Sequence, residues 1–327
     1  MSRLRRLRDT ASMHVRHVLF GGGVFDVSGE HPNRKGWEIF ELGQKSFWAV
    51  PTAIPWDEPV REDPRYAEAI AAMLGFLCPG EKAAVTGASY ISNLVRSEEA
   101  KFYFAEQALE EAKHYDVMRR IIPKITGRAM DAPGPWVRLL YSFGVVERDD
   151  VAFMMGNINI IGEHLAHQIL HKINHKTTDP QVKQVIALIG RDESRHIAAG
   201  QRFFPEVWGE YRRNRHRIMA KNLATTIILM FAGMDMVNPM RTLDIDLANV
   251  LEEMYKHYYE VTHELPAVPE QALFDVLLSR LRKQTPVVVK NIGKVTDEHG
   301  NFDTRRFIGW CGDALKSPRV LKELLAA

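Results

Sequence analysis

The sequence predicts an all-α protein built on a four-helix bundle with additional flanking helices. Three observations lead to this prediction. Apolar residues follow a helical period wherever the 327-residue chain is periodic. Two Glu-x-x-His motifs, ending at His114 and His196, lie on segments rich in Ala, Ile, Leu and Phe. Each motif also has a partner glutamate, Glu81 or Glu163, thirty residues before its own glutamate.

The composition excludes several classes of protein. The net charge is +2 with 26% charged residues, so no global field favours nucleic acid as a partner. The two cysteines, Cys78 and Cys311, lack a metal-binding spacing and fit a reducing compartment. The longest apolar run, near residues 226–234, is short for a membrane span, and the basic N-terminus lacks the apolar core of a secretory signal. We therefore expect a cytoplasmic protein with no membrane span.

Residues 1–60 are predicted to form a basic N-terminal arm and an aromatic strap. Three glycines at 21–23 and four prolines make residues 21–60 look irregular. The aromatic residues of the strap are Trp37, Phe40, Phe47, Trp48 and Trp56. We interpret the strap as packing these rings on the bundle. In the alternative interpretation, Trp48 or Trp56 relays electrons to a metal site.

Residues 61–265 are predicted to form the bundle. A first helix, at 64–76, is expected to end at Pro79-Gly80. Ser97 is a good N-cap, and Asp179-Pro180 combines an N-cap with a proline in the first turn. The four helices that carry the motifs are therefore predicted at about residues 81–96, 98–122, 148–176 and 180–203. Between the two pairs, residues 132–135 are expected to be a loop.

The remaining elements flank this bundle. Helices are expected at about 206–237 and 243–263, separated from their neighbours at Phe204-Pro205 and Asn238-Pro239. Residues 266–327 are predicted to form a C-terminal helical extension. This extension includes a helical pattern at 274–283, a β-prone run at 287–290 and a polar turn at 298–303.

The spacing of the motifs predicts where their side chains meet. In each pair about fifteen residues lead away from the first glutamate and about fourteen return, which is about 22 Å each way at 1.5 Å per residue. Each helical hairpin therefore returns its second carboxylate to the height of its first. Two packed hairpins gather six groups at one level of the bundle. These are Glu81, Glu111, His114, Glu163, Glu193 and His196.

Six ionisable groups on apolar helices predict a di-metal site, because burying them without a compensating ion is costly. Carboxylate and imidazole ligands suit two iron ions or an Mn/Fe pair, with exchangeable positions for O2. The expected bridges are Glu111 and Glu193. One metal is assigned Glu81, Glu111 and His114, and the other Glu163, Glu193 and His196. In the alternative, these residues are ordinary charged helix positions.

Three further residues are candidates for supporting this site. A metal-bound imidazole usually donates its other N–H to a carboxylate. Asp192 is therefore expected to hold His114, and Glu110 to hold His196. Arg195 would offset the surplus negative charge. For Glu110 and Arg195, a surface position is the alternative.

Two other features of the bundle remain open at this level. Four histidines follow one face of the helix predicted at 148–176 and are expected to be partly exposed and solvated, although a metal or proton-transfer role is an alternative. They are His164, His167, His171 and His175. Apolar residues near the site form either a substrate pocket or ordinary core. They are Ala84, Val85, Ala88, Phe153, Met154, Ile158 and Ile161.

The motif pattern resembles that of the ferritin-like di-iron carboxylate superfamily. The pattern is Glu81, Glu111-x-x-His114, Glu163 and Asp192-Glu193-x-Arg195-His196. Its Asp-Glu-x-Arg-His form is similar to that of bacterial di-iron monooxygenases, acyl-carrier-protein desaturases and ribonucleotide-reductase-like ligand-binding oxidases. Chain length and the aromatic lead-in resemble the last group and the reductase small subunit most. The resemblance spans roughly residues 37–205 and implies a ferritin-like bundle in a homodimer.

The chain departs from these relatives at four positions. The radical tyrosine of the reductase small subunit is replaced by Met118, which argues against a ribonucleotide reductase role. The Val–Tyr crosslink of the ligand-binding oxidases has Ala84 and Ile158 in its place. Ile189 stands where aminoarene N-oxygenases have an additional histidine.

The site and the resemblance together imply a non-haem di-iron oxidoreductase of the monooxygenase or oxidase type. Such an enzyme uses O2 to hydroxylate, N-oxygenate or desaturate an apolar small-molecule or carrier-bound substrate, with electrons from a ferredoxin or reductase. A radical-generating ribonucleotide-reductase-like subunit is one alternative, and an iron storage or ferroxidase protein is another.

Overall fold

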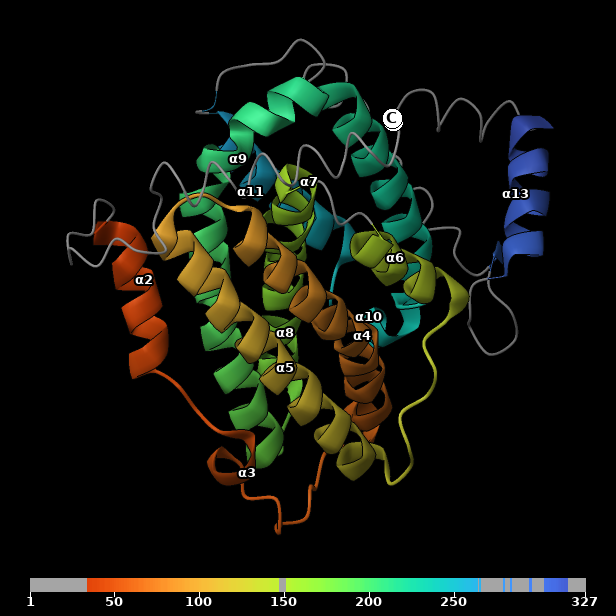
Figure 1. Cartoon of the computed structure of the whole chain (residues 1–327). Coiled ribbons are helices and arrows are strands. Elements are labelled where there is room, and N and C mark those ends of the chain that lie inside the picture. Colours follow the sequence, from red (N-terminus) through yellow and green to blue (C-terminus); the bar gives the residue numbers. More distant parts are fainter. Residues whose placement is uncertain are drawn as a thin grey trace, which may run out of the picture.

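The computed structural model describes residues 34–146, 151–263 and 303–316, with a few single positions between the last two ranges. Within these ranges every regular element is a helix and there is no strand, so the all-α prediction is confirmed. Long helices run side by side in a bundle (Figure 1). They are α4 (Pro64–Leu94), α5 (Glu98–Thr126), the continuous run of α7 (Val151–Met155), η1 (Gly156–Gly162) and α8 (Glu163–Lys176), and α9 (Pro180–Met234).

The predicted helix end at Pro79-Gly80 is wrong, because α4 continues through it to Leu94. A proline inside a helix removes one backbone hydrogen bond and costs about 3 kcal/mol. Packing offsets this cost, since Leu77 and Cys78 before the proline and Glu81 after it are all buried. By length and composition α4 would also be able to cross a membrane, but 56% of its apolar window is buried inside the protein. It is a core helix of the bundle.

The predicted break at Phe204-Pro205 is also wrong. Helix α9 begins at its Asp179 N-cap, continues through Pro205 to Met234 and curves over one end of the bundle (Figure 1). Phe203 before the proline and Trp208 after it are both buried, so packing holds the two halves of α9 together.

The aromatic strap is more regular than predicted. It contains α2 (Arg34–Lys45) and α3 (Val50–Ala53), while residues 21–33 lie outside the described ranges. Helix α2 crosses the bundle closely at two glycines. A Cβ on Gly36 would lie 2.7 Å from Glu99 Cγ, and one on Gly43 would lie 2.6 Å from Glu106 Oε1. Only glycine permits this approach without a shift of the Glu99 and Glu106 side chains.

Within the described part of the chain, four further helices flank the bundle. Helix α6 (Pro135–Val146), which was not predicted, follows the expected loop. The expected break at Asn238-Pro239 falls inside the first turn of α10 (Val237–Thr242), where proline is tolerated. Helix α11 (Leu247–His263) follows, and α13 (Thr304–Lys316) packs Phe307 on Phe231. The helical pattern at 274–283 and the β-prone run at 287–290 lie almost entirely outside the described residues.

Candidate metal centre

The six predicted ligands lie at one level inside the bundle. Glu81 and Glu163 are each 5% exposed, and the other four are fully buried. Two groups of ligand atoms each lie within 4.8 Å of one another. Position 1 is Glu81, Glu111, His114 and Glu193, and position 2 is Glu111, Glu163, Glu193 and His196. Glu111 and Glu193, the two expected bridges, belong to both positions.

Four helical segments supply the six side chains. Helix α4 supplies Glu81, and α5 and α9 each supply one Glu-x-x-His motif. Glu163 follows directly after η1, a π-helical segment in which its backbone N–H bonds to the Ile158 carbonyl, five residues earlier. π-helical segments inside α-helices are frequent at functional sites. Here the segment sets the direction in which Glu163 leaves its helix.

Both histidines present Nδ1 to the carboxylate cluster and Nε2 to a carboxylate outside it. His114 Nδ1 lies 3.2 Å from Glu193 Oε1, and its Nε2 lies 3.3 Å from Asp192 Oδ2. His196 Nδ1 lies 3.2 Å from a Glu193 oxygen, and its Nε2 lies 3.0 Å from Glu110 Oε2. These are the two outer contacts that the sequence predicted. Such contacts fix the tautomer and orientation of a ligating imidazole.

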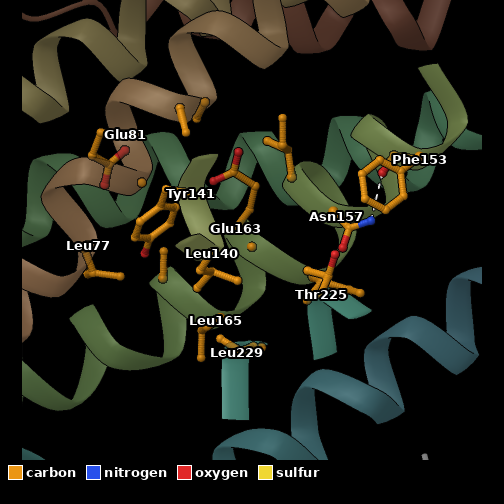
Figure 2. Close-up of a pocket in the computed structure, with 17 residues that line it drawn as sticks. Leu77, Glu81, Leu140, Tyr141, Phe153, Asn157, Glu163, Leu165, Thr225 and Leu229 are labelled. Atoms are coloured by element: carbon orange, nitrogen blue, oxygen red, sulfur yellow. Dashed lines mark hydrogen bonds between the residues drawn. The ribbon is translucent and has the colours of Figure 1, made fainter. Parts of the chain in front are cut away.

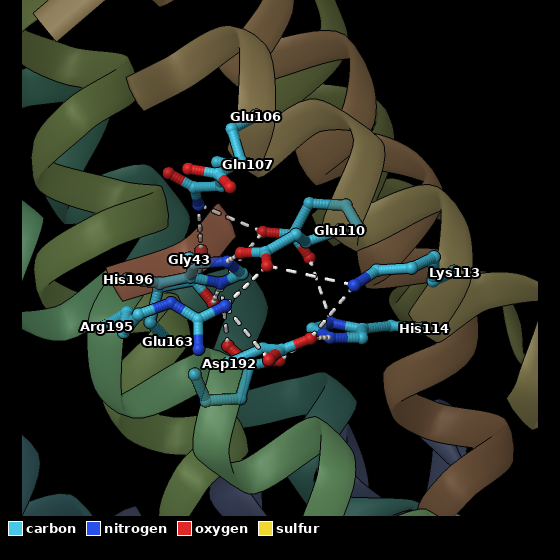
Figure 3. Close-up of polar contacts among 12 residues, drawn as sticks. Gly43, Glu106, Gln107, Glu110, Lys113, His114, Glu163, Asp192, Arg195 and His196 are labelled. Carbon is cyan, nitrogen blue, oxygen red and sulfur yellow. Dashed lines mark hydrogen bonds and ion pairs between the residues drawn. The ribbon is translucent and has the colours of Figure 1, made fainter. Parts of the chain in front are cut away.

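Two buried cations compensate the outer carboxylates (Figure 3). The Arg195 guanidinium pairs with Glu110 and lies 2.9 Å from Asp192 Oδ1. Lys113 Nζ lies 3.3 Å from Asp192 Oδ2 and 3.7 Å from Glu110 Oε1. A surface position is therefore wrong for Glu110 and Arg195, which are 1% and 5% exposed. Lys113 was not predicted, although it stands between the two members of the first motif.

Burial and the neighbouring charges shift the pKa values of the groups in the cluster. Burial raises the pKa of Glu81 and of Glu163 well above the ordinary value, and the charges of Glu111 and Glu193 raise it further. Burial by itself lowers the pKa of His114, but its carboxylate neighbours, Asp192 first, raise it well above the ordinary value. Metal ions would displace the protons of these groups and supply the compensating positive charge.

The donor atoms fit a pair of divalent ions. Glu111 Oε2, His114 Nδ1 and Glu193 Oε1 are buried and make no hydrogen bond of normal geometry with a described residue, although His114 Nδ1 lies 3.2 Å from Glu193 Oε1 and 3.5 Å from Glu111 Oε2. Each of these atoms belongs to a group that can coordinate a metal. Oxygen and imidazole donors without thiolate suit iron and manganese. The six residues therefore fit the di-metal site that the sequence predicts.

Trp48 connects the strap to the centre. Its indole N–H donates to Asp192 Oδ2 at 2.7 Å, and its ring stacks on the His114 ring with centroids 6.4 Å apart. Trp48 is 6% exposed, and Lys113 Nζ lies 4.7 Å from its ring centroid. Trp56 instead donates to the Val50 carbonyl. Of the two candidate relay residues, only Trp48 contacts the centre, through Asp192 and the His114 ring.

An apolar cavity of about 140 Å³ reaches the opposite side of the centre. Glu81 and Glu163 border it at one end, and Leu165 and Leu229 lie at the other (Figure 2). Tyr141 of α6 forms part of its wall. The predicted pocket residues that line it are Ala84, Phe153, Ile158 and Ile161; Val85, Ala88 and Met154 do not.

The four histidines of α8 lie outside the centre. His164 stacks on His257 of α11, with ring centroids 4.5 Å apart. His171 and His175 are exposed and place their Nε2 atoms 3.1 Å from each other. None of the four belongs to a group of three or more possible metal ligands among the described residues. With two of the four histidines exposed and two half-buried, this agrees with the interpretation of a partly exposed stripe.

Comparison with known proteins identifies solved structures of the same architecture. No protein family model and no curated protein matches the sequence. Solved structures do match, among them several R2-like ligand-binding oxidases. The oxidase from Sulfolobus acidocaldarius has a TM-score of 0.52 and 17% identity, over 75% of this chain and 96% of that chain. The chain has the R2-like oxidase fold.

Two variants of an R2-like ligand-binding oxidase also share the fold of this chain. One, with an aerobically reconstituted Mn/Fe cofactor, has a TM-score of 0.54 and 16% identity, over 75% of this chain and 99% of that chain. The other, reconstituted anaerobically, has a TM-score of 0.55 and 16% identity, over 75% and 98%. The predicted resemblance to ribonucleotide-reductase-small-subunit-like oxidases, with a ferritin-like bundle, is confirmed at the level of the fold.

Proposed function

We propose that this protein is a di-metal oxidoreductase that uses O2 at a four-Glu, two-His centre to oxidise an apolar organic substrate. The observation that carries the proposal is the buried ligand cluster, whose carboxylates Glu81 and Glu163 border an apolar cavity. Structures of the same fold are named as oxidases with an Mn/Fe cofactor, which supports an Mn/Fe pair or two iron ions here.

The two metals, when bound, would supply the reducing electrons for O2 and the oxidising power for the substrate. The residues of the chain do the rest. Asp192 and Glu110 orient the two imidazoles. The apolar wall excludes water and holds the substrate next to the carboxylates. Electrons from a ferredoxin or reductase would enter through Trp48, whose indole contacts Asp192 and His114.

The cavity selects the substrate by shape and polarity. A volume of about 140 Å³ with mostly aliphatic and aromatic walls suits a small or slender apolar molecule, or the chain of a carrier-bound one. Hydroxylation, N-oxygenation and desaturation all fit such a site. We also propose that the protein acts as a homodimer in the cytoplasm, which analytical ultracentrifugation and cell fractionation would test.

The first experiment is metal analysis of the purified protein after loading with Fe(II), or with Mn(II) and Fe(II), followed by O2 consumption with a panel of apolar substrates. We expect two metals per chain, matching the two positions, and O2 uptake that depends on substrate. The matched control is Ala84→Leu, whose larger side chain narrows the cavity. This variant should keep both metals and lose the substrate dependence.

Three results would contradict the proposal. Fewer than one metal per chain after loading would remove the di-metal centre. Iron uptake far beyond the two positions would indicate storage, and a stable radical without substrate oxidation would indicate a radical-generating subunit. Met118, fully buried where that subunit has its tyrosine, leads us to expect no such radical.

A further inference from the structure

A buried amide contacts two of the candidate ligands. Gln107 lies on α5 one turn before Glu111 and is fully buried. Its Nε2 lies 2.9 Å from Glu111 Oε1 and 2.7 Å from Glu163 Oε1 (Figure 3). Gln107 therefore joins the second long helix of the bundle to the third at the level of the centre. Its sequence context gave no sign of this contact.

The orientation of this amide follows from its partners. A carboxylate that binds a metal is ionised and only accepts hydrogen bonds, so the NH2 group of Gln107 faces Glu111 and Glu163, with one N–H for each. The amide oxygen then faces the Asn159 side chain, whose Nδ2 donates to it at 2.8 Å. Asn159 is also fully buried and belongs to η1.

A glycine of α9 makes room for Asn159. A Cβ on Gly200 would lie 2.7 Å from the Asn159 backbone oxygen and 2.9 Å from its Cβ. Helix α9 can approach η1 this closely only because residue 200 has no side chain. The close approach keeps Asn159 directed at Gln107, so three helical segments together fix the direction of one amide.

The hydrogen bonds from Gln107 support the two metal positions unequally. Glu163, the outer carboxylate of position 2, has Oε1 on Gln107 and Oε2 at 3.7 Å from His196 Nδ1. Glu81, the corresponding carboxylate of position 1, has its nearest ionic partner at His114 Nδ1, 3.6 Å away. Among the described residues, no side chain outside the six ligands donates a hydrogen bond to Glu81.

We propose that Gln107, directed by Asn159, makes the two metal positions inequivalent. Glu111 serves both positions, but Glu163 belongs to position 2 alone, and Gln107 holds it in one binding geometry, so position 2 takes up its metal more tightly and releases it more slowly than position 1. Glu81, without such a donor, is the ligand free to change its geometry. A ligand held in place before binding loses less conformational entropy when the metal arrives. This inference rests on the proposed di-metal function.

The test uses Co(II), whose visible absorption reports binding, on the full-length protein. The metal-free protein is titrated with Co(II), and the loaded protein is then mixed with a chelator. We expect two binding steps and two release phases. Gln107→Leu should weaken the tighter step by about 10- to 100-fold and leave the weaker step within a factor of about three, so that the two steps merge.

A second variant tests the direction of the amide. In Asn159→Asp the carboxylate accepts from Gln107 Nε2, which turns the amide oxygen toward Glu111 and Glu163. This variant should weaken the tighter step at least as much as Gln107→Leu does, although Gln107 is still present. It also provides the test if circular dichroism shows that Gln107→Leu does not fold. The matched control is Gln181→Leu, which removes a buried amide that donates to the Pro55 carbonyl.

The outcomes separate this inference from the proposed function. If the wild-type protein binds no metal, the proposed function fails and this inference fails with it. If the wild-type protein binds two metals with one affinity and one release phase, only the inequivalence is overturned. It is also overturned if Gln107→Leu and Asn159→Asp weaken both steps equally or match Gln181→Leu.

Discussion

The candidate metal centre has two sides of opposite character. On the side covered by the strap, four charged side chains are buried in mutual contact, and Trp48 covers them. They are Glu110, Lys113, Asp192 and Arg195 (Figure 3). On the other side, the carboxylates Glu81 and Glu163 border an apolar cavity (Figure 2). One level of the bundle therefore meets a dense ionic network in one direction and a space for an apolar molecule in the other.

The charged side and the apolar side of the centre are suited to different tasks. A low-dielectric surrounding strengthens every interaction in the ionic network, provided that each group is paired. The network can therefore hold the imidazoles rigidly and connect them to Trp48. An apolar cavity offers no competing hydrogen bonds, so a substrate there is held by shape. In our proposal electrons arrive on the charged side and the substrate on the apolar side.

The largest effect is expected from Glu111→Ala, which removes a candidate ligand from both metal positions, between the charged side and the apolar side. Affinity at both positions should fall by more than about 100-fold, the upper value for losing a residue outside the ligand set. Metal analysis after loading should give less than one metal per chain. Glu253→Gln, at a half-exposed position on α11, serves as the control and should keep full loading. Full loading of Glu111→Ala would disprove its bridging role.

The next effect concerns the ionic network alone. Arg195→Leu leaves Glu110 and Asp192 buried with one cation fewer, and breaking a buried ion pair costs about 3–5 kcal/mol. Urea denaturation of the metal-free protein measures this loss. The control is Arg34→Leu, which breaks an exposed i,i+4 pair with Glu38 and should change stability far less. Equal losses for both variants would mean that the network does not stabilise the charged side.

A smaller effect compares the two tryptophans of the strap. Trp48→Phe removes an N–H that donates to a carboxylate, which is worth about 1.5–3 kcal/mol, whereas Trp56→Phe removes one that donates to a neutral carbonyl, worth about 0.5–1.5 kcal/mol. Thermal and urea denaturation should rank the variants in this order. Only Trp48→Phe should also slow reduction of the loaded protein by its electron donor. Equal rates for the two variants would argue against a relay at Trp48.

The smallest effect depends on pH and concerns the edge of the charged side. Burial and, after it, the charge of Glu110 raise the pKa of Glu106 to about 7 against the opposing hydrogen bond from Gln44. Arg195 and Lys113 also lower it, and α2 presents Gly43 to the carboxylate. Between the ordinary value of 4.5 and about 7, the folded protein keeps a proton that the unfolded chain has released. Stability from this group therefore falls as pH rises through that window.

Glu106→Gln removes this dependence. The variant should be more stable than the wild type at pH 8 by about 1–2 kcal/mol, and the advantage should shrink toward pH 5. Urea denaturation at pH 5, 6, 7 and 8 measures the difference. Glu38→Gln, an exposed change on α2, should show no such trend. An advantage that is constant across these pH values would mean that Glu106 does not titrate in the window.

The level at which the six candidate ligands meet could be predicted from their positions along the chain. A helix rises by a fixed 1.5 Å per residue, so equal spacings from Glu81 to Glu111 and from Glu163 to Glu193 bring each pair to one height. The same periodicity places His114 beside Glu111. The outer contacts of Asp192 and Glu110 followed from the pseudo-symmetry of the two motifs. These features depend on local geometry, which a sequence carries directly.

The helix ends and the surroundings of the site depend instead on packing between helices. Pro79 and Pro205 locally favour a break, but packing on both sides of each proline offsets the lost backbone hydrogen bond. Trp48 reaches Asp192 across 144 positions of the chain, and Asn159 reaches Gln107 across 52. Such contacts could not be predicted, because Trp48, Gln107 and Asn159 belong to no repeated motif that would fix their positions relative to the centre. The charged side and the apolar side of the centre exist only in the folded bundle.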